Sequence, residues 1–304
     1  MRSRIALAAF TLSAAATTAH AQSCDHNLLI SGYFSNNVAI YDGCDGTFLR
    51  QLEQAGRIAG AQAVRYHEAD GLIYVVSEGN DQIQRYRNDG TYAFVDVFAQ
   101  LASNIDPTGI AFGPGGEVYV ASYGTSSVLE LDPVSGDTIG TLLPSNSGLL
   151  GADNGMMVSA TGQLYVPGYD SSSVAKIDLA TSGIDADFIP SGTGGLFETR
   201  GIVDEGATIL VGGEGSGEIY RFNASSGVLV DTLITGLNRP TGLALDTDGT
   251  ILVLWGNRVR RYDPDTGVLI ETLALGSAGD ISGGTFIALI PNGTDTVFGN
   301  GFDP

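Results

Sequence analysis

Short apolar segments alternate with polar, glycine-rich turns along the chain from residue 27 to residue 291. None of these segments shows the i, i+3, i+4, i+7 spacing of apolar positions that is typical of an amphipathic helix. Aromatic and β-branched residues are frequent within them, and such runs between turn residues are typical of strands. The pattern therefore predicts a chain of short β-strands with almost no helix.

One segment recurs six times along the chain, with a period of about 45 residues. Each copy is a strand followed by a turn in which a glycine lies beside Asp, Asn, Ser or Thr. This is the chemistry of a hairpin, where glycine supplies the positive φ. The copies begin at Asn37, Asp81, Ser126, Ser172, Gly217 and Asn257, and their turn glycines are Gly46, Gly90, Gly136, Gly183, Gly227 and Gly267.

Each repeat contains enough apolar segments for four strands. A further strand follows each turn glycine, as in Phe48–Leu52, and an apolar-aromatic strand such as Ile73–Val76 precedes each copy. A fourth strand lies before that one, most clearly at Thr108–Phe112. Four short strands per repeat predict an all-β, six-bladed β-propeller with four antiparallel strands per blade. A β-sandwich would not repeat six times.

The two ends of the repeat region predict how the ring closes. The first copy lacks an inner strand, whereas Thr285–Ile290 is an isolated inner-type strand at the other end. We expect this segment to pair with Leu28–Ile30, so that the N- and C-terminal strands share one blade and leave no exposed inner sheet edge. The propeller then spans 22–291, and 292–304 form a C-terminal tail.

The first 21 residues have the features of a secretory signal peptide. Arg2 and Arg4 precede an apolar run, Ile5–Ala16, and Ala19-His20-Ala21 fits the cleavage rule, with cleavage before Gln22. The alternative is a membrane anchor, but the run is shorter than the roughly 20 residues that a spanning helix needs. We therefore expect a secreted protein, periplasmic or extracellular.

Two cysteines remain after this cleavage, Cys24 and Cys44. A hairpin formed by Leu28–Ile30 and Val38–Tyr41 brings them within reach of each other, and export permits a disulfide. Closing this loop would contribute roughly 3 kcal/mol. A redox or metal pair is the alternative, but the sequence has no CxxC spacing and no histidine in register.

Composition excludes several classes of partner. The chain has 34 acidic and 14 basic residues, a net charge of −20, whereas nucleic-acid binding needs a basic face. The same charge disfavours anionic membranes. Only three histidines are present, so chemistry that needs several imidazoles is disfavoured. We expect a monomer with a large apolar core.

The loops of a four-stranded blade alternate between the two faces of the ring, which predicts where a site lies. On one face, each blade contributes one residue from the loop between its second and third strands and one from the start of its inner strand. Aromatic edges around polar groups are a common binding surface, so we expect a protein, peptide, small-molecule or glycan ligand there. The alternative is that the aromatic residues pack between blades and the polar ones only hydrate the channel. The candidates are Tyr33, Glu78, Tyr123, Tyr169, Glu214 and Trp255 from the loops, and Gln62, Thr108, Asn154, Arg200 and Thr241 from the inner strands.

The segment 107–122, PTGIAFGPGGEVYVAS, resembles the blade signature of the NHL, YVTN and SMP-30/streptogramin-lyase-like propellers. The resemblance extends over residues 27–291. It implies the architecture and not an activity, because these propellers include binding proteins, lyases and lactonases.

The SMP-30-like lactonases in this superfamily hold a divalent cation in the channel through Glu, Asn and Asp. Asp153-Asn154-Gly155 resembles one element of that site, which makes Asp153, Asn154 and Glu198 the candidate metal ligands. Arg200, however, places positive charge where a Ca²⁺ ion needs anionic oxygens. We therefore expect no cofactor, with Ca²⁺ as the alternative in a metal-dependent lactonase or related hydrolase.

Streptogramin-lyase-like enzymes rely on channel histidines, and none of the histidines here fits that role. His20 belongs to the signal, His26 is near the mature N-terminus, and His67 lies on the opposite face. The sequence therefore favours a non-catalytic binding or scaffold protein.

Overall fold

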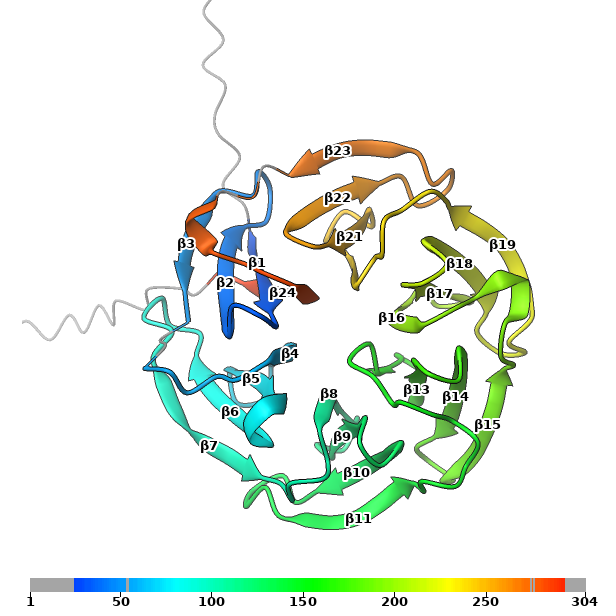
Figure 1. Ribbon diagram of the computed structural model, residues 1–304, viewed down its shortest axis with the longest axis horizontal. Coiled ribbons are helices and arrows are strands. Elements are labelled where there is room, and N and C mark those ends of the chain that lie inside the picture. Colours follow the sequence, from blue (N-terminus) through cyan, green and yellow to red (C-terminus); the bar gives the residue numbers. More distant parts are fainter. Residues whose placement is uncertain (1–24, 53–54, 274, 276, 293–304) are drawn as a thin grey trace, which may run out of the picture.

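The computed structural model describes residues 25–52, 55–273, 275 and 277–292. In this part of the chain the secondary structure is 24 β-strands and three single-turn 3-10 helices, with no α-helix. The strands form six antiparallel four-stranded sheets, arranged around a central channel (Figure 1). The molecule is a six-bladed β-propeller, as predicted.

We number the blades in chain order and give the strands of each from the channel outward. Blade 1 is β24 (Gly284–Pro291), β1 (His26–Gly32), β2 (Asn37–Asp42) and β3 (Phe48–Gln51). Blade 2 is β4 (Ala61–His67), β5 (Leu72–Ser77), β6 (Gln82–Arg87) and β7 (Phe94–Gln100). Blade 3 is β8 (Pro107–Phe112), β9 (Val118–Ser122), β10 (Ser127–Leu131) and β11 (Thr138–Leu143).

The second half of the ring follows the same order. Blade 4 is β12 (Met157–Val158), β13 (Gln163–Gly168), β14 (Ser173–Asp178) and β15 (Gly183–Ile189). Blade 5 is β16 (Thr199–Asp204), β17 (Thr208–Gly213), β18 (Glu218–Asn223) and β19 (Leu229–Ile234). Blade 6 is β20 (Gly242–Leu245), β21 (Ile251–Trp255), β22 (Arg258–Tyr262) and β23 (Leu269–Leu273). The 3-10 helices are η1 (Glu78–Asn80), η2 (Thr193–Gly195) and η3 (Ser277–Gly279).

Blade 1 closes the ring in the predicted way. β24 pairs with β1 in antiparallel register, with Leu28 opposite Leu289 and Ile30 opposite Ile287. The inner strand β24 also contacts the inner strands of both neighbouring blades, β4 and β20. The expected pairing of Thr285–Ile290 with Leu28–Ile30 is therefore confirmed.

The repeated glycine turns join the two outer strands of each blade. In blade 3, the Asp132 carboxylate accepts hydrogen bonds from the backbone N–H groups of Val134 and Ser135, and Gly136 has a φ of 75°. A Cβ at Gly136 would lie 1.9 Å from the carbonyl oxygen of Phe98 in blade 2. Glycine is required here both by the turn and by the contact with the preceding blade.

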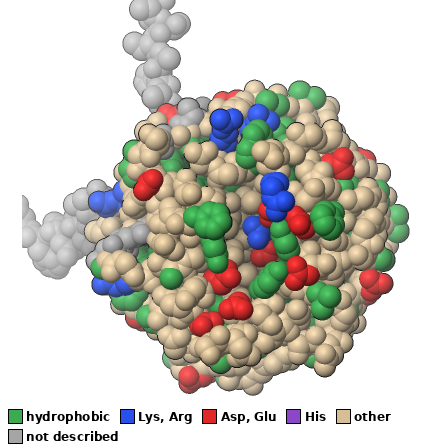
Figure 2. All heavy atoms as spheres, in the orientation of Figure 1, with side chains coloured by type: hydrophobic (Ala, Val, Ile, Leu, Met, Phe, Trp, Pro, Cys, Tyr) green, Lys and Arg blue, Asp and Glu red, His purple; other side chains and the backbone are tan. Residues whose placement is uncertain are grey.

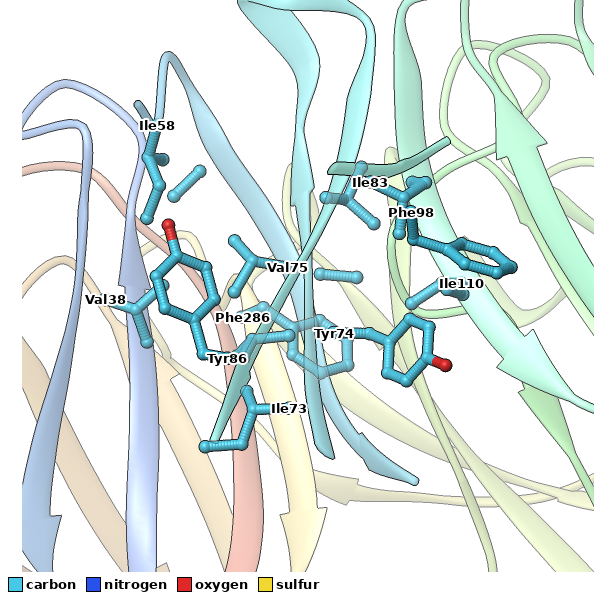
Figure 3. Close-up of a cluster of buried hydrophobic side chains, with 14 of the residues drawn as sticks. Val38, Ile58, Ile73, Tyr74, Val75, Ile83, Tyr86, Phe98, Ile110 and Phe286 are labelled. Atoms are coloured by element: carbon cyan, nitrogen blue, oxygen red, sulfur yellow. The ribbon is translucent and has the colours of Figure 1, made fainter. Parts of the chain in front are cut away.

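The hydrophobic core lies between the blades. Both faces of a blade pack against neighbours, so strands such as β5 are buried at nearly every position. Figure 3 shows one of these layers, with Val38 of blade 1 and Ile110 of blade 3 on either side of Val75. The outermost strands, such as β19 and β23, are largely exposed. This explains why the middle strands of each repeat are the most apolar.

The channel holds a buried cation below the level of the loops. Arg65 of β4 donates hydrogen bonds to the backbone carbonyls of Ile110 and Met156, at 2.8 and 2.7 Å, and its guanidinium lies 5.0 Å from the ring centre of Phe286. Burial lowers the pKa of Arg65 to about 10. This side chain ties three inner segments of the ring together. It also lines a second cavity of about 280 Å³, which β20 and β24 border as well.

Several sequence predictions lie outside the described residues. The signal peptide 1–21, Cys24 and the tail beyond Asn292 belong to this group, so the export signal and the Cys24–Cys44 disulfide stay predictions. None of the helices in the described part of the chain is long and apolar enough to cross a membrane.

Candidate ligand-binding site at the channel mouth

Two loops of each blade repeat the same backbone geometry on one face of the ring. In every blade a residue with positive φ lies one or two positions before the third strand, and another lies one to six positions before the inner strand. These pairs of positions are therefore equivalent from blade to blade. The loop positions are Asn36, Asp81, Ser126, Ser172, Gly217 and Gly256, and the entry positions are Gly60, Asp106, Gly151, Glu198, Arg239 and Gly283.

Backbone hydrogen bonds join these two loops and fix the predicted rim residues. The N–H of Glu78 donates to the carbonyl of Gly60 at 3.1 Å, and the N–H of Glu214 donates to that of Glu198 at 2.8 Å. Tyr33, Tyr123 and Tyr169 donate in the same way to the carbonyls of the corresponding entry positions. The same backbone thus presents tyrosine in three blades and glutamate in two, so the side chain at this position varies around the ring.

The side chains of these loops surround a cavity of about 580 Å³ at the channel mouth. Figure 2 shows this face, where Arg, acidic and hydrophobic side chains gather around the centre of the ring. Every predicted rim residue except Asn154 lines the cavity. The lining includes Tyr33, Gln62, Glu78, Thr108, Tyr123, Tyr169, Arg200, Glu214, Thr241 and Trp255, together with Phe34, Asp153, Asn238, Arg239 and Thr285.

Blade 4 places Asp153, not Asn154, at the cavity. In the other blades the inner rim residue stands two positions after the entry position, and in blade 4 that residue is Asp153. Asn154 is fully buried, where its amide donates to the side chain of Gln62 and to the carbonyl of Thr285, each at 3.1 Å. The inner strand of blade 4, β12, has only two residues and begins well after Asp153, so the position could not be counted from a regular strand.

Phe34 and Arg239 are rim residues that the sequence reasoning missed. Phe34 is 76% exposed and follows Tyr33, with the two rings edge to face at 5.3 Å. Arg239 lies two positions before Thr241, as Glu198 lies two before Arg200. Aligning the loops before the inner strands from blade to blade, as well as the strands themselves, would have identified Arg239 from the sequence.

Arg200 stands at the centre of the site and is held on two sides. Its Nε donates to Asp153 at 2.8 Å, and its Nη1 lies 3.1 Å from a carboxylate oxygen of Glu214. The ring of Tyr169 lies 5.0 Å from the guanidinium. Burial opposes the charge on Arg200, but the charges on Asp153 and Glu214 outweigh burial and raise its pKa. The guanidinium therefore stays charged and is held by two carboxylates.

Arg239 closes the same side of the cavity from above. Its guanidinium donates to Glu214, to Glu198 at 3.1 Å and to the Tyr169 hydroxyl at 3.2 Å. The hydrogen bond to Glu214 is the main reason that the pKa of Arg239 is raised. Glu214 therefore bridges two arginines, and Asp153, Glu198 and Glu214 each have a guanidinium beside them.

Glu78 faces the other half of the mouth in a different environment. Its carboxylate accepts a hydrogen bond from the Gln62 amide. Burial raises the pKa of Glu78 and the Gln62 bond lowers it; the negative charges of Asp106 and Asp153 raise it further, and the charge of Arg200 offsets part of this. No arginine or lysine in the described part of the chain forms an ion pair with Glu78. This carboxyl is thus partly buried without a cationic partner.

The tyrosines of the mouth are neutral hydrogen-bonding groups. Burial, followed by nearby acidic groups, raises the pKa of Tyr123 and of Tyr169 to about 12. The Tyr123 hydroxyl donates to Asp170 at 3.0 Å, and the ring centres of Tyr123 and Tyr169 lie 6.5 Å apart. They present apolar ring surface and polar hydroxyls, and not a phenolate base, to a ligand.

The candidate metal ligands do not fit a Ca²⁺ ion. The carboxylate of Asp153 accepts from the N–H of Asn154 and from Arg200, and Glu198 pairs with Arg239. Among the described residues, no group of three or more His, Cys, Asp or Glu side chains is placed to hold a metal. The oxygens that calcium requires are here neutralised by arginines.

No histidine reaches the mouth within the described residues. His67 ends β4 on the opposite face, where its ring stacks on Phe112 at 4.2 Å. His26 begins β1, 3.0 Å from a carboxylate oxygen of Asp246. Neither histidine can act on a ligand in the cavity.

Comparisons with known proteins support the fold and go no further. No protein-family model and no curated protein matches the sequence. A chain in the crystal structure of a nidogen/laminin complex has a TM-score of 0.72 at 12% identity and covers 88% of this chain and 100% of that one.

Two further solved structures are similar. A protein of unknown function from Bacteroides caccae has a TM-score of 0.65 at 15% identity, covering 88% of this chain and 99% of that one. A catalytically inactive virginiamycin B lyase from Staphylococcus aureus, solved with quinupristin, has a TM-score of 0.61 at 13% identity, covering 89% of this chain and 94% of that one. The TM-scores show that these proteins share the propeller fold, and at identities this low the similarity shows the fold alone.

Proposed function

We propose that this protein is an exported, non-catalytic β-propeller that binds its ligand in the cavity at the channel mouth. One observation carries the proposal: a single cavity of about 580 Å³ collects aromatic, acidic and basic side chains from the loops of all six blades. Concave sites that combine aromatic walls with a few fixed polar groups are typical of ligand binding.

The chemistry of the site favours binding over reaction. Arg200, Arg239 and Glu214 hold each other in place, and the tyrosine hydroxyls keep their protons at neutral pH. A general base would need a group near its pKa at working pH and within reach of a substrate proton. The mouth offers pre-positioned contacts, which reduce the entropy lost on binding.

The finer family assignment belongs to this proposal. The blade signature resembles the NHL, YVTN and SMP-30/streptogramin-lyase-like propellers, and the lyase among the fold neighbours is consistent with that group. The neighbour from the nidogen/laminin complex comes from a protein assembly, which supports a peptide or protein ligand for this chain. We propose a monomer that acts outside the cytoplasm without a resident metal.

The test is capture of ligands by the immobilised mature protein from periplasmic and extracellular material, followed by direct binding of what is captured. Replacing both Phe34 and Tyr123 with alanine removes two aromatic walls of the cavity without touching the buried ion pairs. We expect affinity for the captured ligand to fall at least tenfold, because each ring contributes contact area.

The matched control replaces Val134 with alanine, since Val134 is 86% exposed in a turn on the opposite face. It should bind like the wild type. Equal binding by the wild type and by the Phe34/Tyr123 variant would show that the mouth is not the binding site.

The metal-dependent lactonase remains the alternative function, although the donor set does not favour it. The only observation on its side is the buried Oδ1 of Asn154, which has no hydrogen-bond partner among the described residues. A metal that binds the folded protein raises its melting temperature. Millimolar Ca²⁺ should therefore leave the melting temperature unchanged if our proposal is correct, and an increase that EDTA reverses would favour the enzyme.

A further inference from the structure

One side of the mouth already holds a cation, the guanidinium of the protein's own Arg239. On the side of blades 4 to 6, the guanidinium of Arg239 lies between the carboxylates of Glu214 and Glu198 and donates a hydrogen bond to the Tyr169 hydroxyl at 3.2 Å. Glu214 belongs to the loop of blade 5, Tyr169 to that of blade 4, and Arg239 enters from blade 6. Three successive blades thus supply one tyrosine, two glutamates and one arginine, with Glu198 at the entry position of blade 5.

The opposite side of the ring keeps the tyrosine and one glutamate of this arrangement, but an acidic residue stands at the position of Arg239, and Gly60 stands at the entry position that Glu198 holds in blade 5. Tyr33 of blade 1 occupies the position of Tyr169, and Glu78 of blade 2 occupies that of Glu214, as their shared backbone hydrogen bonds show. The entry position of blade 3, equivalent to Arg239, is Asp106, and both residues have a positive φ. Where one half has an arginine, the other has a second carboxylate.

Gln62, the inner-strand residue that contacts Glu78, does not supply a positive charge either. Gln62 stands at the inner-strand position that Arg200 occupies in blade 5, so Glu78 receives a neutral amide where Glu214 receives a guanidinium. The pKa of Glu78 is raised, because burial and the charges of Asp106 and Asp153 outweigh the Gln62 hydrogen bond and the charge of Arg200. Tyr33 responds in the same way: burial, Glu78 and Asp106 raise its pKa.

We propose that Tyr33 and Glu78, which line the cavity, bind a positively charged group of the ligand, a guanidinium or an alkylammonium, and that the exposed Asp106 adds negative charge beside them. The inference rests on the proposed function and defines the chemistry of the ligand. A cation beside Glu78 would restore the charge balance that Arg239 gives to Glu214. Aromatic rings next to carboxylates are a favourable environment for such groups.

The experiment uses the mature protein and blocked tripeptides as probes: acetyl-Gly-Arg-Gly-amide, with the Gln and Asp peptides as neutral and acidic controls. Fluorescence of Trp255, the only tryptophan in the chain and part of the cavity lining, reports binding. Calorimetry checks it independently. We expect saturable binding of the arginine peptide at least tenfold tighter than that of either control, weakening at acidic pH as Glu78 takes up a proton.

Two variants test the half-site directly. Glu78→Gln keeps the shape of the side chain and removes its charge, and Asp106→Arg supplies the cation at a position where Arg239 already has the same backbone geometry. Each should weaken the arginine peptide about tenfold or more. Glu68→Gln is the matched control, because it makes the same charge change at an exposed turn on the opposite face and should bind like the wild type. Melting curves confirm that all variants fold.

The outcomes separate this inference from the function on which it rests. Equal affinity for the three peptides, or unchanged affinity in both half-site variants, would overturn the cation site. If a captured ligand still depends on Phe34 and Tyr123 in that case, the mouth is a binding site for another class of ligand. Agmatine provides a free organic cation: binding as tight as that of the peptide assigns a small molecule, and much weaker binding assigns a basic peptide side chain.

Discussion

At the scale of residues, the mouth shows two ways of keeping a carboxyl group partly buried. Glu214 lies between two arginines, and each guanidinium offsets part of the loss of hydration. Glu78 has only the amide of Gln62, and an amide compensates a buried charge less well than a guanidinium. The same residue type at equivalent positions therefore has different electrostatic behaviour.

This difference predicts how Glu78 affects stability as a function of pH. Because the folded protein raises the pKa of Glu78 above its ordinary value of 4.5, the folded state holds the proton more tightly than the unfolded state does. Stability from this group is therefore fully present below pH 4.5 and is lost as the pH rises through the folded-state pKa. Glu78→Gln removes the charged form and should raise the melting temperature at pH 7 relative to the wild type.

Calorimetry of the wild type and of Glu78→Gln at pH 4 and pH 7 measures this effect. The variant Glu68→Gln, measured under the same conditions, is the control. The gain from Glu78→Gln should shrink at the lower pH, while the control should show no comparable change. A gain of equal size at both pH values would contradict the assignment to ionisation of Glu78.

At the scale of elements, the inner segments of neighbouring blades approach closely around the channel. A Cβ at Gly155 of blade 4 would lie 1.9 Å from the carbonyl oxygen of Arg200 and 2.8 Å from the Cα of Gly201, both in blade 5. The glycine allows the two segments to pack backbone to backbone. That contact also sets the height at which Arg200 meets Asp153.

We expect Gly155→Ala to lower the free energy of unfolding by about 3 kcal/mol, because backbone atoms of blade 5 must move to admit the methyl group. Gly140→Ala is the matched control: on the outer strand β11, a Cβ would meet nothing closer than 3.6 Å, so its effect should stay within about 0.5 kcal/mol. Urea unfolding monitored by Trp255 fluorescence measures both. Equal stability of the two variants would show that the channel accommodates a Cβ.

At the scale of the whole molecule, the ring depends on one contact between the two ends of the chain. β24 supplies the innermost strand of blade 1 and covers the edge of β1. Without it, β1 would present unpaired backbone groups toward the channel, and such an edge is a template for aggregation. Blades 2 and 6 would also lose the neighbour that β24 gives them.

A chain that ends after residue 283 should therefore lose cooperative unfolding and elute as aggregates in size-exclusion chromatography. The matched truncation ends after residue 292 and keeps β24, so it should melt as one transition. A monomeric, cooperatively folded protein ending at residue 283 would be incompatible with closure through blade 1.

The sequence by itself determined the architecture: six repeats, four strands in each, the closing pair of terminal strands and the loops that meet at the mouth. These follow from local pattern, because strand period, turn glycines and repeat length are all properties of neighbouring residues. What only the tertiary structure decided is how the side chains at the mouth partner each other. Arg200 meets Asp153 from another blade, and Asn154 turns inward toward Gln62 and Thr285. The physical reason is that these partners are far apart in the chain, and ring closure sets their distances and charges together.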